Sequence, residues 1–337
     1  MRPRIAGTLL LVLAATTTAS AQSGSKEDPP ENFIYFGRDR DRIVDPEFLS
    51  NKGVVGAQLK YIWRELEPER DRYSFDAIRS DLEYLERHGK QLFIQLQDVS
   101  FDTAIVNVPD YLLEDPAFNG GAAIHYGGHD EQGPILEGWV ARRWDPAVRA
   151  RIARLLEALA AEFDGRVAGL NLPETAIGFG RDPEHHPAGY SYESYYEGIK
   201  QLMSSTREAF HESDVIIYAN FMPGEELPDD DRGYLKGVYE HADRIGMGVG
   251  GPDLLPQRWF QRQNSLPLIA ARAPGTVAGL AVQWGNLEDK NRQTGEGVTV
   301  EGLYEYGRDE LRLEYIFWGM QEPFFSRDIL PFLQRLD

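Results

Sequence analysis

Eight short apolar runs alternate with segments of helical periodicity along residues 32–337, and this order predicts a single (β/α)8 barrel, or TIM barrel, of the α/β class. No internal repeat and no linker divides this stretch, so its units are assigned to one domain. The alternative is a doubly wound open sheet, which carries a Gly-rich phosphate-binding turn after its first strand. No such turn follows the first apolar run.

The eight predicted strands are short and mostly apolar, and they lie at 33–36, 54–62, 91–97, 167–172, 215–220, 244–249, 277–284 and 315–318. Apolar residues recur at helical spacing between them at 78–85, 148–163 and 195–203, which predicts helices there, and further helices are expected after Pro228, after Val300 and at 328–336. Segment 246–251 also matches G-x-G-x-x-G. Because it lies in the sixth unit with Pro252 directly after it, small residues that allow close packing or a ligand's approach inside a barrel strand explain these glycines better than phosphate binding.

The first 21 residues have the pattern of a secretory signal peptide. Two arginines, Arg2 and Arg4, precede an apolar core at 8–15, and a small-residue cleavage site ends at Ala21. Residues 22–31 are polar and Pro-containing, and we expect them to form a disordered lead-in. The sequence therefore predicts an exported protein, periplasmic or secreted, whose barrel domain occupies 32–337. It contains no cysteine, so its fold is expected to hold without disulfides.

The chain is strongly acidic, with 54 acidic and 35 basic residues and a net charge of −19. Loss of the signal peptide removes two arginines and no acid, which moves the net charge to −21. Such a surface repels nucleic acid and anionic lipid, so neither is an expected partner. No apolar stretch reaches the roughly 20 residues of a membrane-spanning helix, so no membrane span is expected.

The motif W-R-E-L-E-P-E-R-D-R-Y-S-F-D at 63–76 directly follows the second predicted strand. We expect Trp63 and Arg64 to lie at the barrel mouth, Pro68 to end the strand and Asp76 to cap the next helix. The motif resembles the second βα unit of (β/α)8-barrel glycoside hydrolases. Segments 142–148 and 164–171 are similar to the third helix and fourth strand of clan A of those enzymes, particularly the β-galactosidase-like families.

The resemblance implies that Glu174 is the general acid, since in that clan the acid/base Glu follows the fourth strand. It usually comes right after an Asn, whereas two residues intervene here. The clan's nucleophile is a Glu at the end of the seventh strand, where this chain has Gln283, and an amide cannot act as that nucleophile. The identity of the second catalytic carboxylate is therefore undetermined. It is Glu322, which we favour, or Asp253, or else Glu288 if the strand is offset. The remaining alternative is a site that binds sugar without cleaving it.

Carboxylates, amides and aromatic side chains concentrate where the predicted strands end, and this composition suits a sugar ligand. Acids and amides pair with hydroxyls, and flat aromatic faces cover the apolar faces of pyranose rings. The candidate catalytic carboxyls are Glu174, Glu322 and Asp253. The candidate substrate-binding residues are the proposed platforms Trp63, Trp284 and Trp318, the hydroxyl partners Gln97, Asn171, Asn220, Gln283 and Asn286, and the further contacts Arg64, Asp98 and Tyr218.

The resulting prediction is an exported glycoside hydrolase that cleaves an oligo- or polysaccharide, with Glu174 protonating the leaving glycosidic oxygen. No cofactor and no metal is implied. One alternative is a catalytically inactive barrel that binds carbohydrate during polysaccharide handling or export. A second is a metal-dependent esterase that uses loop histidines at 125, 129, 185 and 186. The long loop at 100–144 is expected to be a lid or a wall of the cleft.

Overall fold

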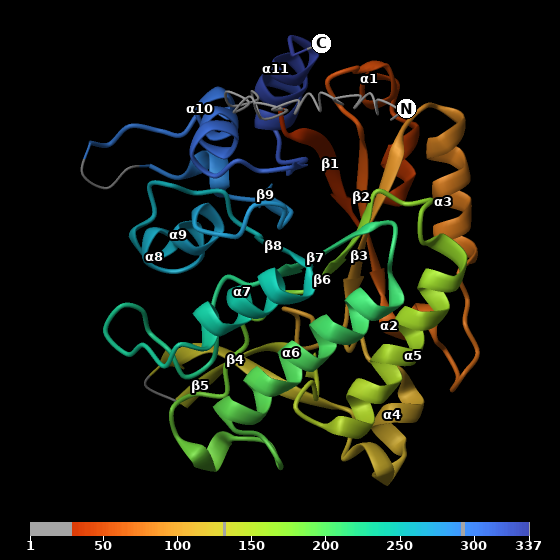
Figure 1. Cartoon of the computed structure of the whole chain (residues 1–337), viewed down its shortest axis with the longest axis vertical. Helices are drawn as coiled ribbons and strands as arrows, with labels where there is room; N and C mark the ends of the chain where they lie inside the picture. Colours follow the sequence, from red (N-terminus) through yellow and green to blue (C-terminus); the bar gives the residue numbers. More distant parts are fainter. Residues whose placement is uncertain (1–28, 131–132, 291–293, 337) are drawn as a thin grey trace, which may run out of the picture.

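Eight parallel strands close into a barrel in the computed structural model, which describes residues 29–130, 133–290 and 294–336 (Figure 1). The predicted signal peptide and most of the lead-in lie outside these residues. In order around the barrel the strands are β1 (Glu31–Gly37), β2 (Gly56–Ile62), β3 (Gln91–Gln97), β6 (Gly169–Leu172), β7 (Asp214–Tyr218), β8 (Gly248–Gly251), β9 (Ala278–Val282) and β10 (Tyr315–Gly319), and β10 pairs with β1. The predicted closed barrel is confirmed, and the open sheet was the wrong alternative.

Helices pack around this barrel (Figure 1). The α-helices are α1 (Pro46–Ser50), α2 (Trp63–Leu66), α3 (Asp76–Arg87), α4 (Asp110–Glu114), α5 (Pro146–Phe163), α6 (Tyr192–Ala209), α7 (Tyr234–Ile245), α8 (Trp259–Gln263), α9 (Ser265–Ala270), α10 (Val300–Glu305) and α11 (Leu330–Gln334). Short 3-10 turns lie at Arg40–Val44, Pro116–Phe118, Pro183–His185 and Asn286–Glu288, and π-helical turns at Tyr306–Glu310 and Phe325–Ile329. Within the described ranges, no helix combines the length and apolar character needed to cross a bilayer.

The sixth barrel strand starts later than the sequence predicts. Arg244 belongs to the last turn of α7, which ends at Gly246 in the left-handed conformation (φ 67°), and β8 begins only at Gly248. The glycines of this strand allow close packing: a Cβ on Gly250 would lie 2.0 Å from the carbonyl oxygen of Gly279. The interpretation of the G-x-G-x-x-G match as a packing feature is therefore confirmed.

Two local predictions on the 63–76 motif are wrong. The strand ends at Ile62, because α2 begins at Trp63, so Pro68 does not end it. Asp76 is the first residue of α3 and not its cap; its carboxylate instead pairs with Arg79 one turn later, at 2.5 Å. A backbone turn, and not a proline, thus redirects the chain from β2 toward the outer helices.

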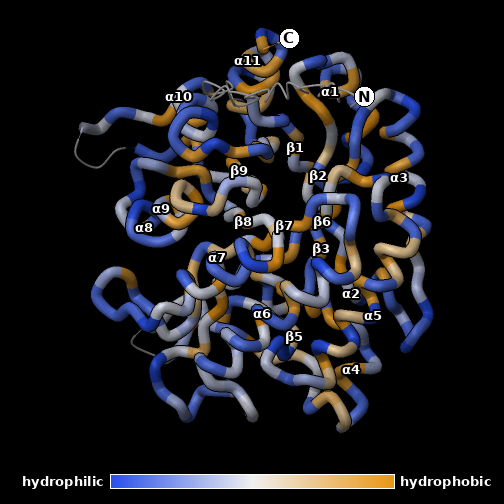
Figure 2. Tube along the Cα trace, in the orientation of Figure 1, coloured by the Kyte–Doolittle hydropathy of each residue, from blue (hydrophilic) through white to orange (hydrophobic). Residues whose placement is uncertain are grey.

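Aromatic side chains fill the barrel interior near the N-terminal ends of the strands. The ring centroids of Phe33 and Phe93 are 5.8 Å apart, those of Phe93 and Phe317 4.9 Å, and Tyr315 packs edge-on against Phe33. The main core lies outside this cluster, between the strands and the helices. Hydrophobic residues accordingly concentrate along the inner segments, while the outer loops are mostly hydrophilic (Figure 2). The interior is closed below and can receive a ligand only from the C-terminal ends of the strands.

The long segment after β3 contains a hairpin that the sequence did not predict. β4 (Ala122–Asp130) and β5 (Gly133–Ala141) pair antiparallel, apart from the barrel sheet. The amide of Ser100 donates to the carbonyl of Trp139 at 2.7 Å, and the amide of Ala141 donates to that of Asp98 at 3.1 Å. These two bonds attach the hairpin to the end of β3, where it forms a wall over the barrel mouth.

Candidate active site

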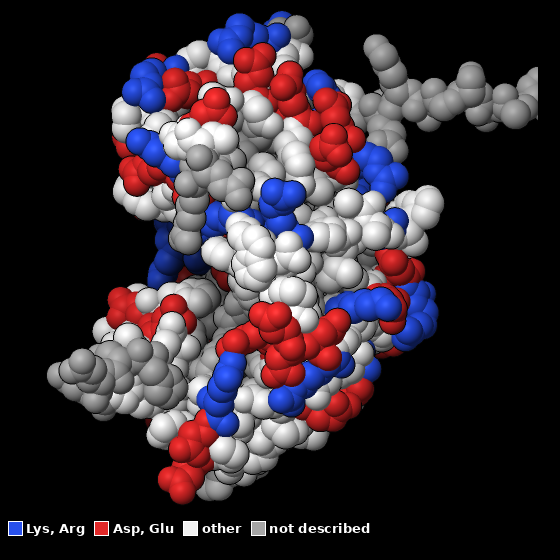
Figure 3. All heavy atoms as spheres, turned by 90° about the vertical axis from the view of Figure 1, so that its left-hand side faces the viewer, with Lys and Arg blue, Asp and Glu red and all other residues white. Residues whose placement is uncertain are grey.

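The C-terminal end of the barrel holds two adjoining cavities that share Glu174 and Phe101. The first, which we call the inner pocket, has a volume of about 490 Å³ and is lined by Tyr35, Arg38, Gln58, Lys60, Gln95, Gln97, Tyr218, Gln283 and neighbouring residues. The second, the outer groove, has a volume of about 1170 Å³ and lies between the hairpin and the loops that follow β6 and β7. The molecule is visibly hollowed on this side (Figure 3).

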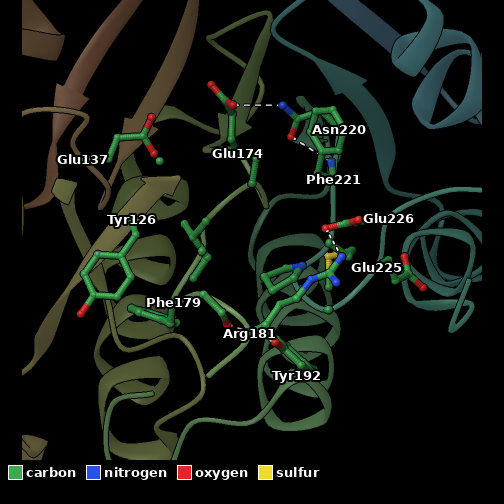
Figure 4. A pocket seen from close by; sticks show the side chains of 18 of the residues that line it. Tyr126, Glu137, Glu174, Phe179, Arg181, Tyr192, Asn220, Phe221, Glu225 and Glu226 are labelled. Carbon is green, nitrogen blue, oxygen red and sulfur yellow. Dashed lines mark hydrogen bonds and ion pairs between the residues drawn. The ribbon is translucent and has the colours of Figure 1, made fainter. Parts of the chain in front are cut away.

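Glu174 stands at the junction of the inner pocket and the outer groove. β6 ends at Leu172, and Pro173, which has no amide hydrogen for a strand ladder, separates the strand from Glu174. The amide nitrogen of Asn220, from the end of β7, donates to the carboxylate of Glu174 at 3.1 Å (Figure 4). The sequence prediction that Glu174 stands over the barrel mouth thus agrees with its position.

The pKa of Glu174 is raised to about 7 from an ordinary value of 4.5. Burial is the largest cause, because it disfavours the charged form of the carboxyl. The hydrogen bond from Asn220 lowers the pKa, the charge of Asp253 raises it, and the cations Lys60 and Arg143 lower it. A carboxyl with a pKa near neutrality can hold a proton and give it up at the same pH, as a general acid must.

A buried ion pair fixes the loop that carries Glu174. Arg143 is 1% exposed and donates two hydrogen bonds to Asp98, at 2.9 and 2.5 Å. The same guanidinium donates to the backbone carbonyl of Glu174 at 2.7 Å and to the hydroxyl of Tyr195 at 3.1 Å, and that hydroxyl donates to the carbonyl of Thr175 at 3.0 Å. Asp98, predicted to contact substrate, lines neither cavity and instead positions Glu174 through Arg143.

Asp253, in the loop after β8, is the carboxylate whose charge raises the pKa of Glu174. Asn286 donates to it at 2.8 Å and Gln261 at 3.4 Å, so two amides hold its side chain in place. The place predicted for a nucleophile is occupied by Gln283, which lines the inner pocket. Asp253 itself lines neither cavity, although it lies close enough for its charge to act on Glu174.

The preference for Glu322 as the second carboxylate is wrong. Its side chain is exposed, lines neither cavity and accepts a hydrogen bond from the hydroxyl of Ser326 at 2.6 Å, at the start of the C-terminal helical turns. Glu288 is also absent from both cavity linings, and its carboxylate accepts from Gln321 at 2.7 Å. Neither carboxylate reaches Glu174.

The predicted tryptophan platforms are not in the cleft. Trp63 and Trp318 are 1% and 0% exposed in the core, where their indole N–H groups donate to Glu67 and Asn32, both at 2.9 Å. Both predictions are wrong, because these side chains point toward the helices. Trp284 is 76% exposed and lines neither cavity.

The other predicted binding residues divide into two groups. Gln97, Tyr218 and Gln283 line the inner pocket and Asn220 lines the outer groove, so these four can meet a ligand. The remaining three are engaged by the protein itself. Arg64 donates to the carbonyl of Val108 and to Asp110. Asn286 donates to Asp253 and accepts from the backbone amide of Gln283, and Asn171 is fully buried inside the barrel.

Sequence reasoning missed much of the lining. Tyr35, Gln58 and Lys60 face the inner pocket from the middle of β1 and β2, one or more residues before the strand ends that were searched. Strict alternation along β2 would have placed Gln58 and Lys60 on the inner face. Phe179, from the loop after β6, and Tyr192, at the start of α6, were also missed; together with Tyr126 of the hairpin they form an aromatic wall of the outer groove (Figure 4).

Among the residues that the structure describes, no three His, Asp or Glu side chains gather as metal ligands would. His125 is fully buried, with its Nε2 2.8 Å from the carbonyl of Ser100, and burial lowers its pKa. His125 lies in β4 and not in a loop, and its contact with Ser100 supports the hairpin.

Comparison with known proteins identifies relatives of the fold only. No protein-family model and no curated protein sequence matches the chain. Among solved structures, a thermostable mutant of a xylanase from Cellvibrio japonicus is similar with a TM-score of 0.51 and 15% identity, covering 87% of each chain. An endo-glycoceramidase II from Rhodococcus sp. has a TM-score of 0.50 and 11% identity over 87% of this chain and 74% of that one. The resemblance to barrel glycoside hydrolases is thereby confirmed at the level of the fold.

Proposed function

We propose that this protein is a glycoside hydrolase in which Glu174 is the general acid. The observation that carries the proposal is a carboxyl with a pKa of about 7 at the junction of two cavities, at the C-terminal end of a (β/α)8 barrel. Below this pH Glu174 carries the proton that a leaving glycosidic oxygen needs. The names of the two structural neighbours, a xylanase and an endo-glycoceramidase, support a carbohydrate substrate.

The lining of the inner pocket supports a polyhydroxylated ligand. Its amides, Gln58, Gln95, Gln97 and Gln283, offer both donors and acceptors, and Tyr35 and Tyr218 add aromatic surface with a hydroxyl. Asp253 contributes its negative charge, which raises the pKa of Glu174, and Asn286 and Gln261 hold its side chain in place.

A catalytically inactive carbohydrate-binding barrel is the second candidate, and Gln283 favours it. The end of β9 presents an amide to the inner pocket where the clan's nucleophilic carboxylate would stand. A barrel that lost this carboxylate keeps its binding surface while it loses turnover. We also propose that residues 1–21 direct export; the exported protein should then begin at Gln22, which N-terminal sequencing of secreted material tests.

The test of the proposed activity is Glu174→Gln, which keeps the shape of the side chain and removes the acid. Turnover of an unactivated glycoside should fall by roughly 10²–10⁴-fold, while a substrate with a very acidic leaving group should be affected far less. Glu322→Gln is the matched control, because that carboxylate is exposed and outside both cavities. Equal turnover of wild type and Glu174→Gln on the unactivated glycoside would remove Glu174 from the mechanism. Sugar binding by the wild type without release of reducing sugar from any polysaccharide tested would favour the inactive barrel.

A further inference from the structure

A lysine points into the inner pocket without a counter-charge of its own. Lys60 lies on the inner face of β2, beside Gln95 of β3, and its ammonium is 5.9 Å from the centre of the Tyr35 ring. Within the described parts of the chain, Lys60 has no ion-pair partner. Its charge is felt by Glu174, whose pKa it lowers.

The other charged groups around the pocket do not neutralise Lys60. Arg38 is paired with Glu65 at 2.7 Å, and both are more than half exposed at the rim. Asp102 is exposed, and its carboxylate accepts from the amide of Ala104. Glu174 is the remaining acid of the lining, and it is neutral while it holds the proton required for catalysis. The resting pocket therefore keeps one uncompensated positive charge at depth, where charges interact more strongly than in bulk water.

The pocket also holds polar atoms that the protein leaves without partners. The side-chain oxygens of Gln58 and Gln95 have no hydrogen-bond donor within the described structure, although these side chains are 0% and 5% exposed. Asn171, fully buried beside Gln95, has neither its oxygen nor its nitrogen bonded. Unpaired buried polar atoms are costly unless a ligand or water completes them. Gln58 and Gln95 both line the inner pocket, so this cost falls at the inner pocket.

We propose that the inner pocket selects a sugar ring that carries an anionic substituent, a carboxylate or a sulfate, and that Lys60 pairs with this group. The inference rests on the proposed carbohydrate function and adds the class of sugar. In a chain with net charge −19 the general surface disfavours anions, so a pocket lysine without an ion-pair partner among the described residues acts as a selective contact. Neutral sugars satisfy the amides equally well but leave the ammonium without a counter-charge.

The experiment is an NMR titration of the full chain carrying Glu174→Gln, so that binding is measured without turnover. Three matched comparisons are made: glucuronate against glucose, galacturonate against galactose, and glucose 6-sulfate against glucose. We expect at least one anionic sugar to bind about tenfold or more tightly than its neutral partner, with the preference weakened by added salt. Comparison of the carboxylate and sulfate arms identifies the substituent.

Substitutions of Lys60 distinguish the effect of its positive charge from the effect of the shape of its side chain on sugar binding. In the same background, Lys60→Met should abolish the preference for the anionic member of each pair, whereas Lys60→Arg should retain that preference. Lys236→Met on α7 is the matched control, because it removes a charge from an exposed site outside both cavities. Thermal unfolding of each variant verifies folding.

Two outcomes overturn different conclusions. If neutral and anionic sugars bind equally, or if Lys60→Met keeps the preference, the inference about acidic sugars is wrong while the carbohydrate function stands. If no sugar of any pair binds, the proposed function falls together with the inference.

Discussion

Glu174→Gln also tests the state of the carboxyl without knowledge of the substrate, through the pH dependence of stability. Between the ordinary pKa of 4.5 and the raised value of about 7, the folded state binds more protons than the unfolded state, so the free energy of unfolding falls as pH rises. Each unit of pKa corresponds to about 1.4 kcal/mol, so ionised Glu174 destabilises the fold by about 3 kcal/mol above pH 7. Below pH 4.5 the carboxyl is protonated in both states, and the effect vanishes.

Urea denaturation, monitored by tryptophan fluorescence from pH 5.5 to pH 8, measures how much the ionisation of Glu174 lowers the free energy of unfolding. Relative to wild type, Glu174→Gln should gain about 2 kcal/mol in the free energy of unfolding across that range, since its neutral amide does not ionise. Glu322→Gln removes an exposed carboxylate, and its curve should run parallel to that of the wild type. Parallel curves for wild type and Glu174→Gln would show that Glu174 ionises normally, and the argument for a general acid would lose its physical basis.

Three further substitutions test the surroundings of the site. Asn220→Ala removes the hydrogen bond that lowers the pKa of Glu174, so the alkaline limb of the pH–rate profile should move to higher pH; a move to lower pH contradicts the assigned contact. Asp98→Asn leaves Arg143 buried without its counter-charge and should lower the free energy of unfolding in urea by about 3–5 kcal/mol, whereas a loss below about 1 kcal/mol would show that the pair is dispensable. Trp318→Ala empties a fully buried position and should cost about 3–5 kcal/mol in the same assay; an unchanged stability would reopen its assignment to the core.

The barrel could be predicted from the sequence because its signal is spread over eight units. Errors at single boundaries, such as the late start of β8, leave the order of elements unchanged. Glu174 could be placed because the resemblance to clan A puts an acid/base Glu just after the fourth strand, and β6 ends two residues before Glu174. The hairpin of β4 and β5 was missed because its Gly- and His-containing strands lack the apolar alternation that marks a strand in the sequence.

Side-chain direction explains the errors at the site. Along β10, Tyr315 and Phe317 face the barrel interior, so alternation sends Trp318 outward to the helices. The position of a strand end does not reveal this alternation, which is why Trp318 was predicted at the barrel mouth and Lys60 was not. The ion pair of Asp98 with Arg143 joins residues from β3 and the segment before α5, a contact that a single sequence does not encode in any local pattern.

The aromatic cluster of Phe33, Phe93, Tyr315 and Phe317 limits how a ligand can enter and leave the barrel. They fill the barrel interior beneath the inner pocket, so a ligand that enters at the C-terminal end of the barrel must also leave there. A long polymer cannot thread through this protein as through a tunnel. A polymer would have to enter and leave at the C-terminal face of the barrel, where the inner pocket adjoins the outer groove.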